Sequence, residues 1–84
     1  MYEVYLGRTA EKDLLRLSAD NYKRIILHLT ALEGNPKPHG CRKITGSKND
    51  WRIRIGKYRI IYEINEVEKT IKIFRIKHRR EVYR

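Results

Sequence analysis

The sequence predicts an α+β fold, in which an N-terminal strand and a helical hairpin precede an antiparallel meander, with both helices packed on one face of the sheet. Two observations predict it. Between residues 9 and 32 the apolar residues recur at the three- and four-residue spacing of helices, whereas from residue 41 they recur at every second position, as in strands. The 84 residues leave room for one hydrophobic core, so we expect 1–84 to form a single domain.

The first half of the chain contains one short strand and two helices. The segment "YEVYL" alternates as an opening strand does, and Thr9 is a candidate N-cap for the first helix. Ser18 or Asp20 begins the second helix, and Gly34 followed by Asn35-Pro36 ends it. Its apolar stripe consists of Tyr22, Ile25, Ile26, Leu29 and Leu32. The short connection between the helices predicts an antiparallel pair.

The second half reads as four strands. "CRKITG" is a weak strand candidate, residues 51–55 and 58–64 are strong ones, and residues 70–77 form the last. Gly56-Lys57 suits a two-residue type II′ turn between the two strong strands. The last strand carries apolar residues on both faces, so we expect it to have a neighbouring strand on each side.

The hairpin of residues 51–64 separates apolar from basic positions. One face, which we assign to the core, carries Trp51, Ile53, Ile55, Tyr58, Ile60, Tyr62 and Ile64. The other face carries Arg52, Arg54 and Arg59, and the predicted turn puts Arg54 directly opposite Arg59. Like charges opposite each other destabilise an antiparallel pair. The three arginines are therefore either a solvated face or a site for an anion such as phosphate, which the planar guanidinium binds in bidentate fashion.

The overall charge favours an acidic partner. The chain has 20 Lys+Arg against 10 Asp+Glu, a net charge of +10 and a pI of about 10.1, which is typical of proteins that bind nucleic acid. No apolar run approaches the roughly 18 residues of a membrane span, and no signal peptide is visible, so we expect no membrane partner. The single cysteine, Cys41, excludes an internal disulfide and predicts a cytoplasmic protein.

Motifs for other chemistries are missing from the sequence. His28, His39 and His78 are scattered without ligand spacing, and there is no glycine-rich phosphate loop and no Ser-His-Asp set, so we expect neither a metal nor a cofactor. The C-terminal "KHRREVYR", residues 77–84, combines a histidine, three arginines and a tyrosine. This segment is either a basic tail or part of a site, in which the aromatic ring stacks on a base or the phenol transfers a proton.

Two stretches of the second half resemble a known family. "WRIRIGKYRIIYEI" and "FRIKHRREVY" resemble the RelE/ParE superfamily of bacterial and archaeal toxins, specifically the RelE-type mRNA interferases, and "AEKDLLRLSADNYKRIILHLTAL" is similar to the helical hairpin of that family. The resemblance implies the RelE-like fold and the toxin of a type II toxin–antitoxin system. It also implies cleavage of messenger RNA in the ribosomal A site and control by a cognate antitoxin wrapped over the toxin.

The resemblance also implies roles for single residues. Arg52 and Arg54 match two basic positions that are often lysines in the family, and Arg59 matches the arginine that holds the scissile phosphate. Arg79 matches the arginine of the family's H-R motif. The neighbouring cations that we expect to contact RNA are Lys57, Lys77, Arg80 and Arg84.

Proton transfer is assigned to the C-terminal segment. A metal-independent nuclease can use the 2′-hydroxyl of RNA as its nucleophile, given a proton acceptor, a proton donor and cations on the phosphate. Arginine stays protonated and is a poor base. Tyr83, which matches the family's C-terminal tyrosine, is the first candidate for proton transfer and His78 the second, unless positioning alone drives the reaction.

Two other functions fit the same scaffold. One is a ParE-type toxin that acts on DNA gyrase without nuclease chemistry, and the presence of both Arg79 and Tyr83 argues against it. The other is a non-catalytic RNA-binding module, which needs the arginine groove but does not depend on Tyr83.

Overall fold

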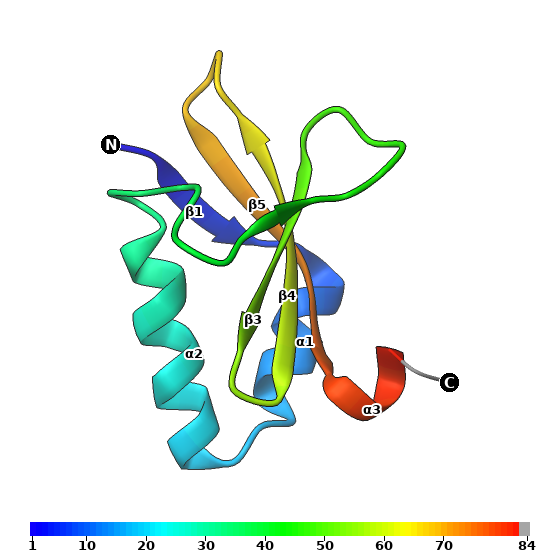
Figure 1. Cartoon of the computed structure of the whole chain (residues 1–84). Coiled ribbons are helices and arrows are strands. Elements are labelled where there is room, and N and C mark those ends of the chain that lie inside the picture. The colour runs from blue at the N-terminus through cyan, green and yellow to red at the C-terminus, as the bar shows by residue number, and fades with distance from the viewer. Residues whose placement is uncertain (83–84) are drawn as a thin grey trace.

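The computed structural model describes the backbone of residues 1–82 and the side chains of residues 1–80. The chain forms a five-stranded mixed sheet with two longer helices and one short one (Figure 1). In chain order the elements are β1 (Glu3–Leu6), α1 (Arg8–Leu15), α2 (Ala19–Ala31), β2 (Arg42–Lys43), β3 (Asp50–Ile55), β4 (Tyr58–Asn65), β5 (Thr70–His78) and α3 (Arg79–Val82). The strand order is β1-β5-β4-β3-β2, with β1 parallel to β5 and the other pairs antiparallel. The predicted α+β architecture is confirmed, and the weak strand candidate at residues 41–46 contributes only two residues.

The start of α1 differs from the prediction. Helix α1 begins at Arg8 with Gly7 in the N-cap position and no side-chain cap, so the expected cap by Thr9 is wrong. The reason lies in the sheet, because the N–H of Gly7 donates to the carbonyl of Ile73 at 2.8 Å and extends the pairing of β1 with β5 by one residue. A Cβ atom at position 7 would lie 3.2 Å from that carbonyl oxygen. The chain therefore turns directly from strand into helix at a glycine.

Helix α2 begins where the sequence indicates. The Oγ of Ser18 accepts a hydrogen bond from the N–H of Asn21 at 3.3 Å, which is the side-chain cap expected at a helix N-terminus. The helix ends at Ala31, and single turns of i to i+3 hydrogen bonds continue it as far as Gly34. Of the predicted apolar stripe, the residues at and after Ile25 face the core, whereas Tyr22 is 40% exposed.

The hydrophobic core lies between α1, α2 and one face of the sheet. Its buried members are Ala10, Leu14, Ile25, Leu29, Leu32, Ile53, Ile55, Ile60, Tyr62, Ile64, Ile71, Ile73 and Ile76. The predicted core face of the hairpin is confirmed, with Trp51 and Tyr58 partly buried at its margin. Tyr62 is fully buried and its hydroxyl donates to the carbonyl of Pro36 at 2.9 Å. Burial, together with the neighbouring Cys41 thiol, raises the pKa of Tyr62, so this phenol stays protonated.

The turn between β3 and β4 sets the register of the hairpin. Gly56 has φ +59°, and positive φ at the first turn residue alone is the signature of the predicted type II′ turn. Ile55 consequently pairs with Tyr58, and Arg54 pairs with Arg59. The predicted register is confirmed.

Strand β5 contains a β-bulge in its middle. Ile61 of β4 pairs with Arg75, but the next residue, Tyr62, pairs with Ile73, so Phe74 is an extra residue without a partner. Residues that face the core have odd numbers before the bulge and even numbers after it. The apolar residues on both faces of this strand therefore arise partly because the bulge shifts the alternation by one residue. The prediction that the strand has a neighbour on each side is confirmed, since β5 lies between β1 and β4.

The carboxylate of Asp13 in α1 holds this bulge. Its Oδ2 accepts hydrogen bonds from the Nε of Arg75 at 2.8 Å and from the backbone N–H of Ile76 at 2.9 Å, and its Oδ1 accepts from the Nη2 of Arg75 at 3.3 Å. The side chain of Asp13 is 8% exposed. Burial alone would raise the pKa of Asp13, but the hydrogen bonds from Arg75 and Ile76 outweigh it and hold this pKa below its usual 3.8.

Asp13 is expected to make stability depend on acid pH. Because its pKa is lower in the folded state than in the unfolded chain, its contribution is complete above pH 3.8 and is lost as the pH falls below that value. Asp13→Asn should lower the unfolding free energy by about 2 kcal/mol at pH 7, since hydrogen bonds to a charged group are lost. In urea unfolding, the difference in unfolding free energy between Asp13→Asn and the wild type should shrink as the pH is lowered from 4. Glu11→Gln, which changes an exposed acid of the same helix, serves as the control. A gap of constant size would contradict this expectation.

Candidate nucleic-acid interface

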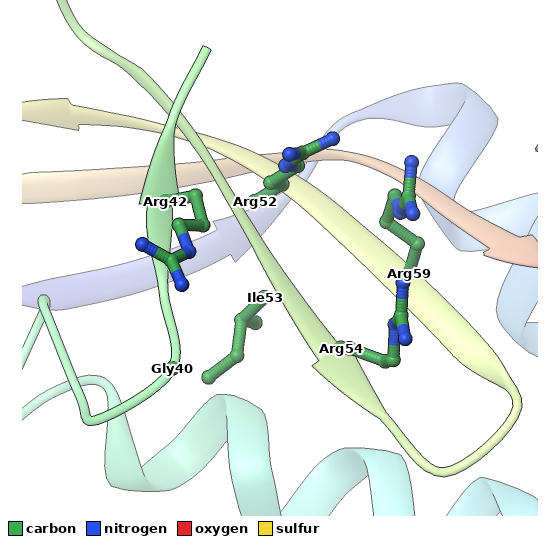
Figure 2. Close-up of a pocket in the computed structure, with 6 residues that line it drawn as sticks. All are labelled: Gly40, Arg42, Arg52, Ile53, Arg54 and Arg59. Carbon is green, nitrogen blue, oxygen red and sulfur yellow. The ribbon is translucent and has the colours of Figure 1, made fainter.

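The hairpin presents its arginines on the sheet face opposite the core. Arg52 and Arg54 extend from β3 and Arg59 extends from β4, and their side chains point to the same side of the hairpin in Figure 2. Arg52 and Arg54 are exposed and Arg59 is half-buried. The predicted convergence of these three side chains is confirmed.

A fourth arginine joins them from the edge strand β2. Arg42 pairs with Arg52, and the two share a face because residues directly opposite in an antiparallel pair project to the same side. We call Arg42, Arg52, Arg54 and Arg59 the arginine face. These four side chains, with Gly40 and Ile53, line an open depression of about 310 Å³ (Figure 2).

Sequence reasoning missed Arg42 because the strand that holds it has only two residues. A two-residue strand is too short to show a period, and the side of the sheet on which its residues lie follows from pairing with β3. The available signal was the weak strand candidate "CRKITG", which predicted a strand but not its register.

Arg79 reaches the same region from the C-terminal end. Strand β5 ends at His78, and the short helix α3, which the periodicity did not indicate, begins at Arg79. The N–H of Arg79 donates to the carbonyl of Lys57 at 2.7 Å, so the start of α3 is tied to the hairpin turn. Arg79 lines a small hollow together with Arg54 and Arg59. The predicted site residues Arg52, Arg54, Arg59 and Arg79 are therefore brought together.

The neighbouring cations lie in two places, one on the side of the arginine face and the other at the end of the sheet. Lys77 pairs with Arg59 and lies on the arginine face side of the sheet. Lys57 and Arg80 line a separate hollow of about 500 Å³ with His78 and Arg79 at the end of the sheet.

His78 is the predicted candidate that lies apart from the arginine face. It pairs with Tyr58 and therefore projects to the core side of the sheet, where the two rings meet edge to face with centroids 5.2 Å apart. Its Nδ1 accepts a hydrogen bond from the N–H of Arg80 at 3.1 Å, which leaves Nε2 for other partners. The other two C-terminal candidates, Tyr83 and Arg84, lie outside the described residues.

The positive charge of the arginine face is not neutralised by the side chains of residues 1–80, which are those that the structure describes. Two ion pairs lie in this part of the chain, from Lys37 to Glu66 and from Asp13 to Arg75, and neither includes the arginine face. The acids Asp50 and Glu63 pair with each other two positions beyond Arg52 in the register, and no ion pair of the described side chains links them to Arg52. Four like charges without counter-charges repel one another, and a bound anion would relieve that repulsion.

The arrangement can bind a phosphate and stabilise additional negative charge on it. Arginine donates hydrogen bonds but does not accept a proton, so the depression itself supplies binding and electrostatic stabilisation rather than a base. Among the side chains that the structure describes, those of residues 1–80, no three His, Cys, Asp or Glu gather as metal ligands. No helix in the same part of the chain is long and apolar enough to cross a membrane.

The sequence matches one family model over nearly its whole length. Residues 4–83 match the family described as the ParE toxin of the type II toxin–antitoxin system parDE. A curated relative, Toxin RelE3 of Methanocaldococcus jannaschii, is 34% identical over 85 aligned residues, which cover 96% of this chain and 94% of the relative.

Solved structures of toxins share the fold. RelE in the archaeal RelE–RelB complex from Pyrococcus horikoshii superposes with a TM-score of 0.83 at 32% identity, over 93% of this chain and 94% of that one. The isolated RelE toxin of E. coli superposes with a TM-score of 0.81 at 18% identity, over 99% of this chain and 92% of that one. At that lower identity the likeness concerns the fold alone.

Proposed function

This chain belongs to the RelE/ParE superfamily of toxins from type II toxin–antitoxin systems, and from that membership we propose that it is a ribosome-dependent endoribonuclease that cleaves messenger RNA. One observation carries the proposal. Arginines from β2, β3 and β4 share one exposed sheet face and have no acidic partner among the described side chains of residues 1–80. A face of this kind suits the backbone of a polyanion more than an uncharged or cationic ligand.

The proposed reaction is a transfer of the phosphoryl group to the neighbouring 2′-hydroxyl. The 2′-oxygen forms a bond to phosphorus, the bond from phosphorus to the 5′-oxygen breaks, and a cyclic phosphate and a free 5′-hydroxyl result. Arg54 and Arg59, which are directly opposite each other, would bind the non-bridging oxygens of the pentacoordinate phosphate. Arg52 and Arg79, on either side of them, would hold the flanking chain.

The reaction also needs one proton removed from the 2′-hydroxyl and one delivered to the 5′-oxygen. We assign this transfer first to Tyr83 and second to His78, as the family resemblance implies. The position of His78 on the core side of β5 makes it the weaker candidate, because the arginine face lies on the other side of the strand. The mechanism proposed here uses no metal.

The partners that we propose are the ribosome with its messenger RNA and a cognate antitoxin. RelE is solved as a complex with RelB in the archaeal relative from Pyrococcus horikoshii, which is 32% identical to this chain. An acidic antitoxin segment laid over the arginine face would neutralise its charge and block access to it.

A ParE-type toxin that acts on DNA gyrase is the second candidate. The matching family model is described as a ParE toxin, and this observation favours the alternative. It predicts no cleavage of RNA and no requirement for the arginine face in catalysis.

Primer extension on messenger RNA tests the proposal. We expect discrete cuts in an mRNA that is being translated by purified ribosomes and none in the same mRNA without ribosomes. Adding the product of the adjacent gene should suppress the cuts. Translated mRNA that stays intact would contradict the endoribonuclease proposal, and a gyrase supercoiling assay on the same preparation would test the second candidate.

A further inference from the structure

Along the second half of β5, a helix rather than a strand covers the edge of the sheet. β1 pairs with β5 only from Thr70 to Ile73, although β5 continues to His78. Beside the remaining half of β5 lies α1, and its buried Asp13 accepts the edge N–H of Ile76 at 2.9 Å. On the side of β5 away from β4, the carboxylate thus takes the place of the strand partner that Ile76 lacks there.

This contact falls two residues after the extra residue of the bulge. Without the bulge, strand alternation would bury Lys77 and turn Ile76 to the solvent-facing side. With it, Ile76 pairs with Ile60 in the core and Lys77 pairs with Arg59 on the side of the arginine face. The side of the sheet on which residues 76 and 77 lie therefore decides whether a fifth cation, Lys77, joins the four arginines of the arginine face.

We propose that Asp13 is a positioning residue for RNA binding, because its carboxylate holds the β5 bulge in the register that keeps Lys77 beside Arg59. This inference rests on the proposed function, since it concerns the same RNA-binding face.

The chemistry of the contact explains why a carboxylate suits this position. A bulge interrupts the ladder of backbone hydrogen bonds, and a buried N–H without a partner is strongly unfavourable. Asp13 satisfies the N–H of Ile76, and a second set of hydrogen bonds to Arg75 holds the carboxylate in place. No buried side-chain nitrogen or oxygen of the described residues lacks a partner, which agrees with a site adapted to this geometry.

The salt dependence of RNA binding tests the inference. For single strands the slope of log affinity against log salt changes by about 0.7 for each phosphate contact. With a single-stranded oligo(U) probe, we expect Asp13→Ala and Lys77→Ala each to reduce this slope by about 0.7, and the double variant to lose no more than either alone. Glu11→Ala, which removes an exposed acid from the same helix, is the matched control and should keep the wild-type slope.

The possible results distinguish a failure of the proposed role of Asp13 from a failure of the proposed RNA-binding function. A wild-type slope in Asp13→Ala, or additive losses in the double variant, would overturn the role of Asp13 while leaving the proposed function intact. A wild-type protein that binds no oligo(U) would contradict the proposed RNA site itself, and with it the role of Asp13 in binding.

Amide hydrogen exchange provides a test that does not require the alanine variant to fold. The N–H of Ile76 should be among the protected amides of the wild-type protein. In Asp13→Asn, whose neutral oxygen is a weaker acceptor, this amide should exchange roughly five- to tenfold faster, while the amide of Ile60 keeps its rate. Equal exchange at Ile76 in both proteins would overturn the inference.

Discussion

Arg59→Ala is expected to reduce the rate of mRNA cleavage by two to three orders of magnitude, about the effect of removing one preorganised donor from a site that stabilises developing charge. We expect the large effect because Arg59 lines both the depression of the arginine face and the hollow that includes Arg79. It is also half-buried, so its guanidinium is held closer to one position than those of the exposed arginines. Primer extension on translated mRNA measures the effect.

Stability distinguishes a lost catalytic group from a damaged fold. Arg59 pairs directly with Arg54, so removing one of these like charges should leave the unfolding free energy unchanged or raise it by a few tenths of a kcal/mol. Arg8→Ala, which removes the same charge from the exposed start of α1, should retain full cleavage. Unchanged cleavage by Arg59→Ala, or a loss that parallels unfolding, would contradict the assignment.

Ile25→Ala is expected to destabilise the protein by about 3–4 kcal/mol, because it removes a fully buried side chain and leaves a cavity. The loss is a large part of the roughly 5–15 kcal/mol that stabilises a typical domain. Ile25 contributes to the core from α2, in one cluster with buried residues of α1 and of the sheet. Urea unfolding monitored by circular dichroism measures the change.

The same helix provides the matched control. Leu27, two residues further along α2, is 72% exposed, and Leu27→Ala removes an equal number of carbon atoms. Its effect should lie within about 0.5 kcal/mol, as for surface substitutions in general. Similar losses in the two variants would mean that α2 does not pack on the sheet through the face that includes Ile25.

The hairpin is the part of the fold and site that the sequence determines most completely. Gly56 permits positive φ, the alternation separates Ile53 from Arg54, and together they specify both the turn type and the arginine pairing. The turn type and the pairing depend on residues that are close in the chain, and such local effects can be predicted from a single sequence. The placement of Arg54 opposite Arg59 followed from them.

The features that sequence analysis did not predict depend on contacts between distant segments. The bulge at Phe74 appears only when β5 is paired with β4, and the edge contact to Asp13 joins residues 63 positions apart. In the same way, Gly7 replaced Thr9 at the start of α1 because Ile73 holds the chain there. Alternation indicates that a strand exists, but it does not indicate which strand lies beside it.

The parallel pairing of β1 with β5 has a consequence for synthesis of the protein. Glu3 pairs with Thr70 and Leu6 pairs with Ile73, so β1 finds its partner strand only after the helices and β2 to β4 have also been translated. Contacts of such long sequence separation form late, because the closing loop must be ordered first. Until β5 has been translated, the nascent chain therefore holds an incomplete sheet, in which β4, the strand that carries Arg59, lacks one of its two neighbours.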